Sequence, residues 1–325
     1  MNKNSINYGI IGFGSYAEKR LIPAFLKTRH ARLLAISRRQ IDAARSSSLK
    51  YNIPYYYSHP IELVKNPDIE VVIVATPPAL HEEHAILAAK YRKHILLEKP
   101  MTSSAAEMKN IIRYCKRYRV KLMSAFVMRF IDAIQTAREL VQGELLGELN
   151  YAGGYMGINA SKVQREWLED PFVSAGGAVA DLGSHMLDLL EYVTGKKIID
   201  LKYFLKPRYS PQTIEKNAVI SLEFESGIIG STYLSFTIRR ESGLTFWGSK
   251  GKLSLQNFNR PEEEVELELV SERGIEKIHV LNRQYYALML DHFAHAILHG
   301  EPLLSNGENG LHNQELLDRI YQRKK

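Results

Sequence analysis

The sequence predicts an α/β fold with two domains. Residues 1–125 are expected to form a doubly wound parallel sheet, and residues 126–325 an α+β domain with a large, mostly antiparallel open sheet. Three observations support this division. Apolar runs alternate with amphipathic stretches in the first part, as they do in βαβ units. Strand-like runs separated by short turns dominate the second part, and a length of 325 residues suits two domains.

Five apolar runs in the first part are expected to be parallel strands, at residues 8–11, 32–37, 71–75, 94–98 and 121–125. The third of them is β-branched at residues 71–74, which is typical of a strand buried on both faces. Stretches with helical spacing lie between the runs, at residues 41–51, 79–92 and 103–118. Pro23 is expected to kink or restart the first helix, and residues 55–57 to form a short strand near the sheet edge.

The second part is expected to begin with a helix at residues 131–142 and a strand at residues 149–155. Further strands are expected at residues 218–224, 228–236, 244–247, 252–255 and 265–270, and helices at 285–298 and 311–321. Gly227, Gly243 and Gly251 are interpreted as hairpin turns between these strands. The strands carry many apolar residues, such as Ile220, Leu222, Phe224, Tyr233, Leu234 and Phe236. One helix layer would leave some of them uncovered, so a self-associating face is expected.

Composition excludes several classes of protein. The chain is 45% hydrophobic and 24% charged, as soluble globular proteins are. It has no apolar run of about 18 residues and no apolar leader near Met1, so no membrane segment is expected. The single Cys115 cannot form an intrachain disulfide, which favours the cytoplasm. A net charge of +7 without a reader motif favours a phosphorylated small ligand over nucleic acid.

A glycine-rich turn follows the first predicted strand. Gly12, Gly14 and Ala17 have the spacing Gly-x-Gly-x-x-Ala between that strand and the next helix. In such a turn the first glycine permits the tight bend and the second lets the backbone approach a pyrophosphate. The small third residue allows close helix–strand packing, and the helix start offers N–H groups to phosphates. The position of the motif predicts a Rossmann-type domain that binds a dinucleotide.

The end of the second strand indicates which dinucleotide. About 20 residues past the glycines, an acidic residue would hold a ribose 2′-hydroxyl. Here the strand ends in Ser37, Arg38 and Arg39, and the first acid is Asp42. A guanidinium pairs with a phosphate in bidentate geometry, whereas a carboxylate would repel it. The sequence therefore predicts NADP(H), with NAD(H) as the alternative if both arginines are merely solvated.

Three more motifs carry a family resemblance. Residues 74–81 read Val-Ala-Thr-Pro-Pro-Ala-Leu-His, residues 98–100 read Glu-Lys-Pro, and residues 176–188 read Gly-Gly-Ala-Val-Ala-Asp-Leu-Gly-Ser-His-Met-Leu-Asp. Together with the glycine turn, their order and spacing resemble the Gfo/Idh/MocA oxidoreductases over nearly the whole chain. The resemblance implies NAD(P)-dependent oxidation or reduction of a sugar, polyol, cyclitol or related carbonyl compound. It also implies a homodimer or homotetramer.

The resemblance implies a set of catalytic residues. The lysine of the Glu-Lys-Pro motif corresponds to Lys99, and the family's Asp-x-x-x-His pair corresponds to Asp181 and His185. The protein must move a hydroxyl proton while the cofactor carries the hydride. Lys99 and His185 are candidates for that proton transfer, and which of them acts directly is left open. Asp181, four residues before His185, is expected to orient the imidazole from the same helix face.

The cofactor-binding residues expected from these motifs are Gly12, Phe13, Gly14, Ser15, Tyr16, Ser37, Arg38, Arg39, Ala75, Thr76, Pro77, His81, Glu98 and Lys99. The substrate-binding residues expected are Lys99, Tyr155, Arg165, Trp167, Asp181 and His185. Gly176 and Gly177 are expected to let a polyol approach backbone N–H groups. The three catalytic groups are expected to meet around one reactive C–H bond.

Two other interpretations were weighed. His81 with His84, His292 with His295, and Asp181 with His185 and Asp188 have spacings seen in metal ligands. Nothing in the sequence unites these rows into three or four converging ligands, so no metal is expected. A catalytically silent NADP(H)-binding regulator of the same fold is the alternative function. The presence of Lys99, Asp181 and His185 disfavours it.

Overall fold

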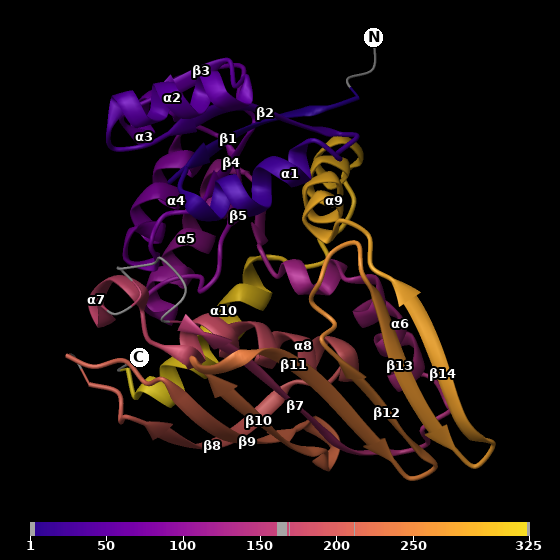
Figure 1. Ribbon diagram of the computed structural model, residues 1–325. Helices are drawn as coiled ribbons and strands as arrows, with labels where there is room; N and C mark the ends of the chain where they lie inside the picture. The colour runs from indigo at the N-terminus through magenta and orange to yellow at the C-terminus, as the bar shows by residue number, and fades with distance from the viewer. Residues whose placement is uncertain (1–3, 161–167, 169, 211, 324–325) are drawn as a thin grey trace. The chain divides into compact units, whose positions relative to one another are not determined.

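The computed structural model describes residues 4–160, 168, 170–210 and 212–323. The chain folds into two compact units, and each is described by itself (Figure 1). The first unit contains Met1–Phe126 and Tyr286–Glu315, and the second contains Val127–Tyr285 and Leu316–Lys324.

The division expected from the sequence needs one correction, because residues 286–315 belong to the first unit. They carry most of α9 (Tyr285–His299) and the start of α10 (Gly307–Tyr321). The Tyr8 hydroxyl donates to the carbonyl oxygen of Leu290 at 2.9 Å, and the Asp291 carboxylate accepts the N–H of His30 at 2.7 Å. These contacts join residues more than 250 positions apart, which local periodicity does not report.

The first unit holds a six-stranded sheet in the order β3-β2-β1-β4-β5-β6, with every pair parallel. Its strands are β1 (Ile6–Ile11), β2 (Ala31–Ser37), β3 (Tyr55–Tyr57), β4 (Val71–Val74), β5 (His94–Leu97) and β6 (Leu122–Ser124). The expected doubly wound sheet is confirmed, as is the edge position of β3. Residues 71–74 are fully buried, as a β-branched run covered on both faces should be.

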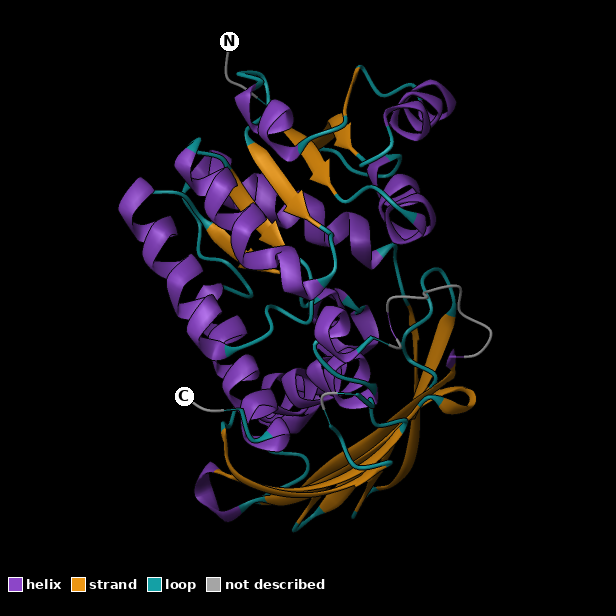
Figure 2. Ribbon diagram, turned by 90° about the vertical axis from the view of Figure 1, so that its left-hand side faces the viewer, coloured by secondary structure: helices purple, strands orange, loops and turns teal. Residues whose placement is uncertain are grey.

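Helices cover both faces of this sheet (Figure 2). They are α1 (Ile22–Phe25), α2 (Ile41–Tyr51), α3 (Pro60–Lys65), α4 (His81–Lys90) and α5 (Ala105–Tyr118), with a 3₁₀ turn η2 at Pro78–Leu80. The sequence predicted α2, α4 and α5 but not the short α3. Ser104 caps α5, because its hydroxyl accepts the N–H of Glu107. The apolar stripe of α5 then packs Met108, Ile111 and Ile112 into the core beneath the sheet.

The second unit holds an eight-stranded sheet in the order β14-β13-β12-β11-β7-β10-β9-β8, antiparallel except for the pair β7/β10. Its strands are β7 (Leu149–Asn159), β8 (Ile198–Lys206), β9 (Asn217–Phe224), β10 (Ile229–Ser235), β11 (Thr237–Gly248), β12 (Gly251–Gln256), β13 (Glu264–Ser271) and β14 (Gly274–Leu281). The remaining elements are η3 (Val127–Phe130), α6 (Asp132–Gln142), α7 (Pro171–Ser174), η6 (Val179–Gly183), α8 (Ser184–Thr194) and η7 (Glu225–Gly227). The mostly antiparallel sheet is confirmed; β8 and β14 were not foreseen.

One face of this sheet packs against α6 and α8 (Figure 2). Side chains alternate between the two faces with a period of two residues. Ile220, Leu222 and Phe224 of β9 all point to the helix side and are buried, as are Leu234 and Phe236. The sequence interpretation that these residues need a second cover is therefore wrong.

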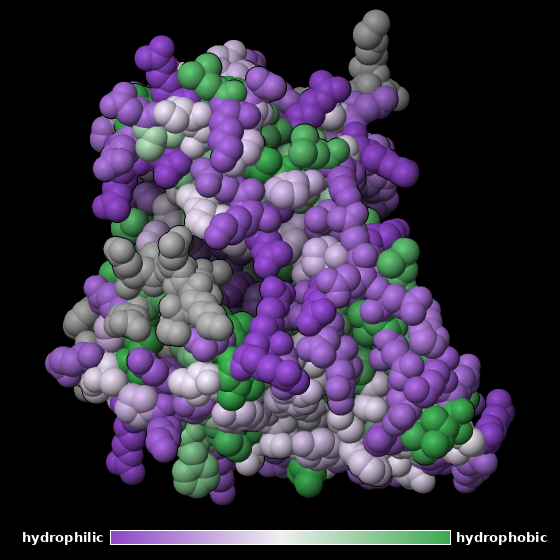
Figure 3. Space-filling view, in the orientation of Figure 1, coloured by the Kyte–Doolittle hydropathy of each residue, from purple (hydrophilic) through white to green (hydrophobic). Residues whose placement is uncertain are grey.

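The opposite face exposes a different apolar set. Phe204, Val219, Ile229 and Trp247 are 82%, 44%, 61% and 52% exposed. The strand register aligns Phe204 with Val219, Val219 with Tyr233, and Tyr233 with Tyr155 across four strands. Figure 3 shows hydrophobic residues, in green, among hydrophilic ones on the lower part of the view. We call the exposed side of β8, β9, β10, β7 and β11 the outer face.

Gly243 was expected in a turn but lies inside β11, opposite Tyr155 of β7. A Cβ at Gly243 would approach the Tyr155 ring to 2.5 Å. The glycine thus leaves room for the aromatic ring to lie across the neighbouring strand. The turn between β11 and β12 is made by Ser249 and Lys250 instead.

Two helices begin with a π turn. In η1 (Ala17–Leu21) the N–H of Ile22 donates to the carbonyl of Ala17, and α1 then starts with Pro23 in its first turn. The wider turn suits a proline, which has no N–H and whose ring crowds the carbonyl four residues earlier. The expected restart at Pro23 is not seen, because Leu21 and Ile22 before it keep helical φ and ψ; the irregularity is the π turn of η1. In η6 the N–H of Ser184 donates to Val179 in the same i to i−5 pattern. Such turns often occur at functional sites.

Within the described part of the chain, no helix combines the length and the apolar character that crossing a membrane requires.

Candidate functional site

The candidate residues of the first unit lie at one edge of its parallel sheet. The register aligns Ile11, Ser37, Val74, Leu97 and Ser124 at the carboxyl ends of five strands. The segments that follow them contain the glycine turn, the Arg38 and Arg39 pair, the Thr76 turn and the Glu98–Lys99 turn. In open α/β sheets, ligands bind outside this edge where the strand order reverses, which here is between β1 and β4.

The two glycines of the turn have different reasons to be glycine. Gly12 has φ +87°, and a Cβ there would meet the Thr76 backbone nitrogen at 2.7 Å. Gly12 is therefore required by the protein's own packing. A Cβ on Gly14 would come no closer to any described atom than 4.0 Å, at the Gly12 carbonyl. Gly14 thus leaves an open surface beside the backbone, and such a surface fits an approaching pyrophosphate.

A hydrogen bond joins the glycine turn to the Glu-Lys-Pro turn. The Tyr16 hydroxyl donates to Glu98 Oε1 at 2.6 Å, and Glu98 is buried. Burial and the nearby Glu98 raise the pKa of the Tyr16 phenol well above its ordinary value, so Tyr16 stays a donor. Lys99 follows as a partly buried residue, and its peptide bond to Pro100 is cis. Two expected cofactor-binding residues, Tyr16 and Glu98, therefore contact each other.

His81 lies between two of these turns. Its Nδ1 is 2.9 Å from the Met101 carbonyl oxygen, and its Nε2 is 2.7 Å from the Thr76 carbonyl oxygen. The side chain is 1% exposed. Burial lowers the pKa of His81 to about 4 and outweighs the two carbonyl contacts, which favour the charged form. A hydrogen bond from this ring to a cofactor, as the sequence predicted, would require one of these contacts to break.

Arg38 is the first residue after β2. Its Nη1 donates to Ser47 Oγ at 2.8 Å and lies 3.6 Å from Glu18 Oε1. Its side chain is 31% exposed, and Arg39 beside it is exposed. Neighbours from α2 and η1 therefore hold the Arg38 guanidinium, while part of its surface remains accessible to a phosphate. The carbonyl of Ser37 accepts the N–H groups of Gly12 and Phe13, which ties this strand end to the glycine turn.

Asp181 and His185 lie on η6 and α8 in the second unit. Both side chains are only 8% exposed. The sequence argument placed them on one α-helical face, whereas the structure places a π turn between them. Every residue of α8 is buried. Buried positions restrict side-chain motion, and restricted motion suits groups that must hold a geometry.

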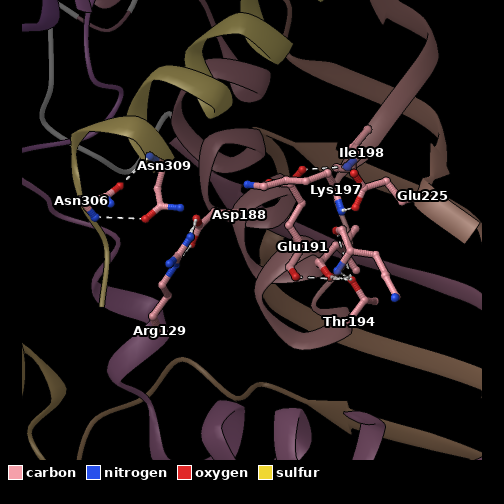
Figure 4. Close-up of polar contacts among 11 residues, drawn as sticks. Arg129, Asp188, Glu191, Thr194, Lys197, Ile198, Glu225, Asn306 and Asn309 are labelled. Carbon is pink, nitrogen blue, oxygen red and sulfur yellow. Dashed lines mark hydrogen bonds and ion pairs between the residues drawn. The ribbon is translucent and has the colours of Figure 1, made fainter. Parts of the chain in front are cut away.

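A buried ion pair anchors the next turn of α8 (Figure 4). Arg129 of η3 donates to both Asp188 oxygens, with Nη2–Oδ1 at 2.6 Å and Nε–Oδ2 at 3.0 Å. The guanidinium carbon also lies 4.9 Å from the centroid of the Tyr192 ring. Asp188 therefore has a structural partner of opposite charge. Sequence reasoning missed Arg129, because nothing in the local pattern around it signals a partner 59 residues away.

The structure does not bring Tyr155 to Asp181 and His185. Its neighbours Gly154 and Met156 face the helix side, and a Cβ on Gly154 would lie 3.2 Å from the Met186 sulfur of α8. Strand alternation therefore points Tyr155 to the outer face, where it lines a hollow of about 380 Å³ with Tyr151 and Tyr233. Its expected role in the substrate site is corrected on this ground. Arg165 and Trp167 lie outside the described residues.

Among the described residues, no group of three or more His, Cys, Asp or Glu side chains is arranged to hold a metal ion. Both His81 nitrogens face carbonyl oxygens, and Thr76 Oγ1 contacts His84 Nδ1 at 3.1 Å. These ring nitrogens of His81 and His84, one of the rows that resembled metal ligands in the sequence, thus have other contacts.

Comparisons with known proteins match a family to each of the two units. The family described as "Oxidoreductase family, NAD-binding Rossmann fold" matches residues 6–126, and "GFO/IDH/MocA C-terminal domain" matches residues 134–254. The chain is 26% identical over 262 residues to the trans-1,2-dihydrobenzene-1,2-diol dehydrogenase of Mus musculus, covering 80% of this chain and 77% of the relative.

Solved structures share the fold. The aldose-aldose oxidoreductase of Caulobacter crescentus, complexed with glycerol, has a TM-score of 0.89 and 24% identity, covering 98% of this chain and 97% of its own. A levoglucosan dehydrogenase, in complex with NADH and levoglucosan, has a TM-score of 0.88 and 19% identity, covering 98% and 96%.

Proposed function

The chain belongs to the Gfo/Idh/MocA family of NAD(P)-dependent oxidoreductases, and from this premise we propose that it transfers a hydride between NADP(H) and a sugar, polyol, cyclitol or related carbonyl compound. The observation that supports the proposal most is the shared sheet edge of the glycine turn, Arg38 and the Glu98–Lys99 turn. Relatives with sugar or dihydrodiol substrates favour the substrate class.

The residues at this edge fit a dinucleotide. The open backbone at Gly14 would take the pyrophosphate, and the start of η1 would present N–H groups to it. When bound, the nicotinamide supplies the carbon that donates or accepts the hydride. The Thr76 turn follows β4, which pairs with β1, and the Glu98 turn follows β5, which pairs with β4; both would border the rest of the cofactor.

We assign the preference for NADP(H) to Arg38 and Arg39. A guanidinium supplies paired donors for a 2′-phosphate, and the Ser47 hydroxyl helps to hold that of Arg38 in place. Arg38→Ala should raise the Kd for NADPH at least about tenfold, because one charge-assisted contact is lost, and should leave that for NADH within about twofold. Fluorescence titration with both cofactors measures this. Tighter binding of NADH than NADPH by the wild type would refute the preference.

We assign the transfer of the substrate's hydroxyl proton to Lys99 or His185, and the orientation of the His185 imidazole to Asp181. A carbinol oxidised at carbon must lose its hydroxyl proton, and a carbonyl reduced there must gain one. Lys99→Met, Asp181→Asn and His185→Ala should each lower kcat by about 100-fold or more, since positioned proton transfer contributes this much. Their Kd for the cofactor and their unfolding midpoints are the controls. Wild-type kcat in all three variants would reject the assignment.

The alternative, an NADP(H)-binding regulator without catalysis, makes a different prediction. Oxidation of NADPH at about 340 nm, the absorbance of reduced nicotinamide, is followed with ketoses, aldoses and dicarbonyl sugars, and reduction of NADP⁺ with polyols and cyclitols. Turnover of any of these compounds that is lost in Lys99→Met supports the enzyme. Cofactor binding with no turnover across the panel supports the regulator.

We propose that the outer face joins two copies of the chain. It is apolar at Phe204, Val219 and Trp247, and exposed apolar patches of this kind mark association surfaces. A second copy is the occupant considered, because closed twofold contacts are the commonest protein assemblies. Val219→Glu should convert a dimer to a monomer in light scattering, whereas Leu49→Glu, on exposed α2, should not. A wild type that is monomeric at micromolar concentration would refute this.

A further inference from the structure

A buried carboxylate lies at the start of η6, the turn that carries Asp181. Glu215 is fully buried and precedes β9. Its Oε1 accepts the N–H of Val179 at 2.8 Å and that of Gly177 at 3.2 Å, and its backbone carbonyl accepts the N–H of Ala178 at 3.0 Å. One residue thus satisfies three consecutive N–H groups from more than 30 positions away. The start of a helix normally leaves such groups without an intrahelical partner.

Tyr321, the last residue of α10, completes this arrangement. Its hydroxyl donates to Glu215 Oε1 at 2.7 Å and accepts the N–H groups of Ala180 at 3.0 Å and Gly177 at 3.2 Å. The Tyr321 ring is itself held, because the Arg323 guanidinium carbon lies 4.6 Å from its centroid and Arg323 Nη2 donates to the Ala175 carbonyl. Glu215 and Tyr321 together therefore hold residues 177–180. We call these two residues the clamp.

The glycines before η6 are explained by the clamp. Gly176 has φ +128°, and a Cβ there would lie 2.2 Å from the Tyr321 hydroxyl oxygen. A Cβ on Gly177 would lie 2.0 Å from the Glu215 carbonyl oxygen. The sequence suggested that these glycines expose N–H groups to a polyol. The structure instead commits the Gly177 N–H to Glu215 and Tyr321, so the glycines serve the close approach of the clamp.

The clamp acts directly on the position of Asp181. The N–H of Asp181 donates to the Gly177 carbonyl at 3.0 Å, so the helix begins from the clamped residue. A displacement of about 1 Å in a catalytic group can cost on the order of 100-fold in rate. The residue before η6, Ala178, has no side chain that could cap the turn locally. The direction in which η6 and α8 leave the turn therefore depends on Glu215 and Tyr321.

We propose that Glu215 and Tyr321 are positioning residues: they hold the turn at residues 176–180 so that Asp181 and His185 are presented to the substrate in one fixed arrangement. The inference rests on the proposed function of Asp181 and His185 in proton transfer. Neither Glu215 nor Tyr321 is required to touch the substrate or the cofactor.

The charge of Glu215 guides the choice of variants. Burial raises the pKa of the Glu215 carboxyl above its ordinary value, and the donors from Tyr321, Val179 and Gly177 oppose that shift. Its Oε1 alone accepts the Tyr321 hydroxyl, the Val179 N–H and the closer Gly177 contact. A glutamine keeps one oxygen acceptor at this place without the charge. Glu215→Gln is therefore the conservative variant and Glu215→Ala the disruptive one.

Steady-state kinetics of the full chain test the clamp. Glu215→Ala should lower kcat at least about tenfold and shift a limb of the kcat–pH profile by about half a pH unit or more, since displaced groups titrate in a changed environment. The KM for NADPH should stay within about twofold, because the cofactor-binding edge belongs to the first unit. Glu215→Gln should return kcat to within about threefold of wild type, and Tyr321→Phe should lower it about fivefold.

Glu191 offers a matched control. It is a buried carboxylate on α8 that accepts the N–H of Ile198 at 2.7 Å, near the far end of the helix (Figure 4). Glu191→Ala should lower the unfolding midpoint but leave kcat within about twofold of the wild-type value. A comparable loss of kcat in Glu191→Ala would overturn the inference, since any destabilisation of α8 would then suffice.

The remaining outcomes are distinct. If His185→Ala and Asp181→Asn lower kcat but Glu215→Ala and Tyr321→Phe leave it and the pH profile unchanged, the clamp inference is overturned and the proposed function stands. If His185→Ala and Asp181→Asn keep wild-type kcat, the proton-transfer role proposed for Asp181 and His185 fails instead, and the clamp inference fails with it. Should Glu215→Ala not fold, Tyr321→Phe decides: reduced kcat with a shifted pH profile supports the clamp, and wild-type values for both overturn it.

Discussion

The two units hold their candidate residues in different ways. In the first unit these residues lie in turns that directly follow the strands, and main-chain hydrogen bonds between neighbouring strand ends hold the turns together. The N–H of Ala75, for example, donates to Ile11, and that of Glu98 to Val74. In the second unit Asp181 and His185 lie on a buried helix, which is held by Arg129, Glu215 and Tyr321 from distant parts of the chain.

The difference also appears in the buried titratable groups. The first unit buries His81 and His84 and partly buries His94 and His292, and desolvation lowers the pKa of each. The second unit buries Glu215, whose pKa burial raises. The comparison teaches that a parallel sheet places the turns at its edge largely through the backbone of its strand ends, with side-chain hydrogen bonds such as Tyr16 to Glu98 added between the turns. A buried helix such as α8 depends on buried polar partners, whose removal is costly.

The largest effect is expected at the buried pair of Arg129 and Asp188. Arg129→Ala leaves a buried carboxylate without its partner and should lower the free energy of unfolding by about 3–5 kcal/mol. Urea denaturation measures this. As the control, Lys277→Ala removes the exposed pair with Glu266 and should cost no more than about 1 kcal/mol. If Arg129→Ala lowers the free energy of unfolding by less than about 1 kcal/mol, the contrast between the two units is contradicted, because α8 would then not depend on this remote partner.

The next effect concerns pH. The pKa of His81 in the folded protein is about 4, against an ordinary value of 6.5, so the unfolded chain takes up a proton first as the pH falls. The stability from His81 is therefore present above about pH 6.5 and is lost as the pH falls towards 4, by about 2 kcal/mol at pH 5. Urea denaturation measures the free energy of unfolding at pH 7 and pH 5. The decrease between these two pH values should be smaller in His81→Gln than in the wild type, by this amount. Equal drops in both proteins would contradict the prediction.

The stability that Glu215 contributes depends on pH in the opposite direction. Its folded pKa is raised, so its contribution is greatest below the unfolded pKa of about 4.5 and is lost as the pH rises through the folded value. Hydrogen exchange followed by peptide should therefore show that lowering the pH from 7 to 5 weakens protection around residues 76–101 more than around residues 177–190. Exchange rates are corrected for their intrinsic pH dependence.

The smallest effect on stability separates the two glycines of the cofactor turn. Gly14→Ala should change the free energy of unfolding by no more than about 0.5 kcal/mol, because a Cβ finds open space there. It should nevertheless weaken NADPH binding about tenfold, because that space is assigned to the pyrophosphate. Gly12→Ala should instead cost about 1–2 kcal/mol, from its positive φ and the clash with Thr76. Unfolding and fluorescence titrations of both variants test this contrast.

Much of the first unit was predictable from sequence. The strands at residues 32–37, 71–75 and 94–98 were placed within a residue or two, because each is a short apolar run between turn residues. The site candidates there follow from the same local order, since the carboxyl ends of parallel strands share an edge. The π turn at η1 was not predicted; a kink or restart at Pro23 was expected in its place.

In the second unit the positions of most strands could be predicted, but the contacts that their side chains make could not. Alternation identified β9 and β10 but not which of their faces the helices cover, so the wrong apolar residues were expected to be exposed. Tyr155 was assigned to the substrate site although strand alternation points it to the outer face. Glu215, Tyr321 and Arg129 carried no signal, since a single buried acid, tyrosine or arginine looks like a surface residue in sequence.

The sequence by itself determined the alternation of strands and helices in the first unit and the glycine turn after β1. These depend on turn chemistry and on side-chain periodicity, which are energies between near neighbours in the chain. The candidate catalytic residues Lys99, Asp181 and His185 were named instead by the resemblance of their motifs to the family. Only the tertiary structure decided which distant residues support η6 and α8. A buried polar group must find a partner in space, and residues far apart along the chain supply it once the core has packed.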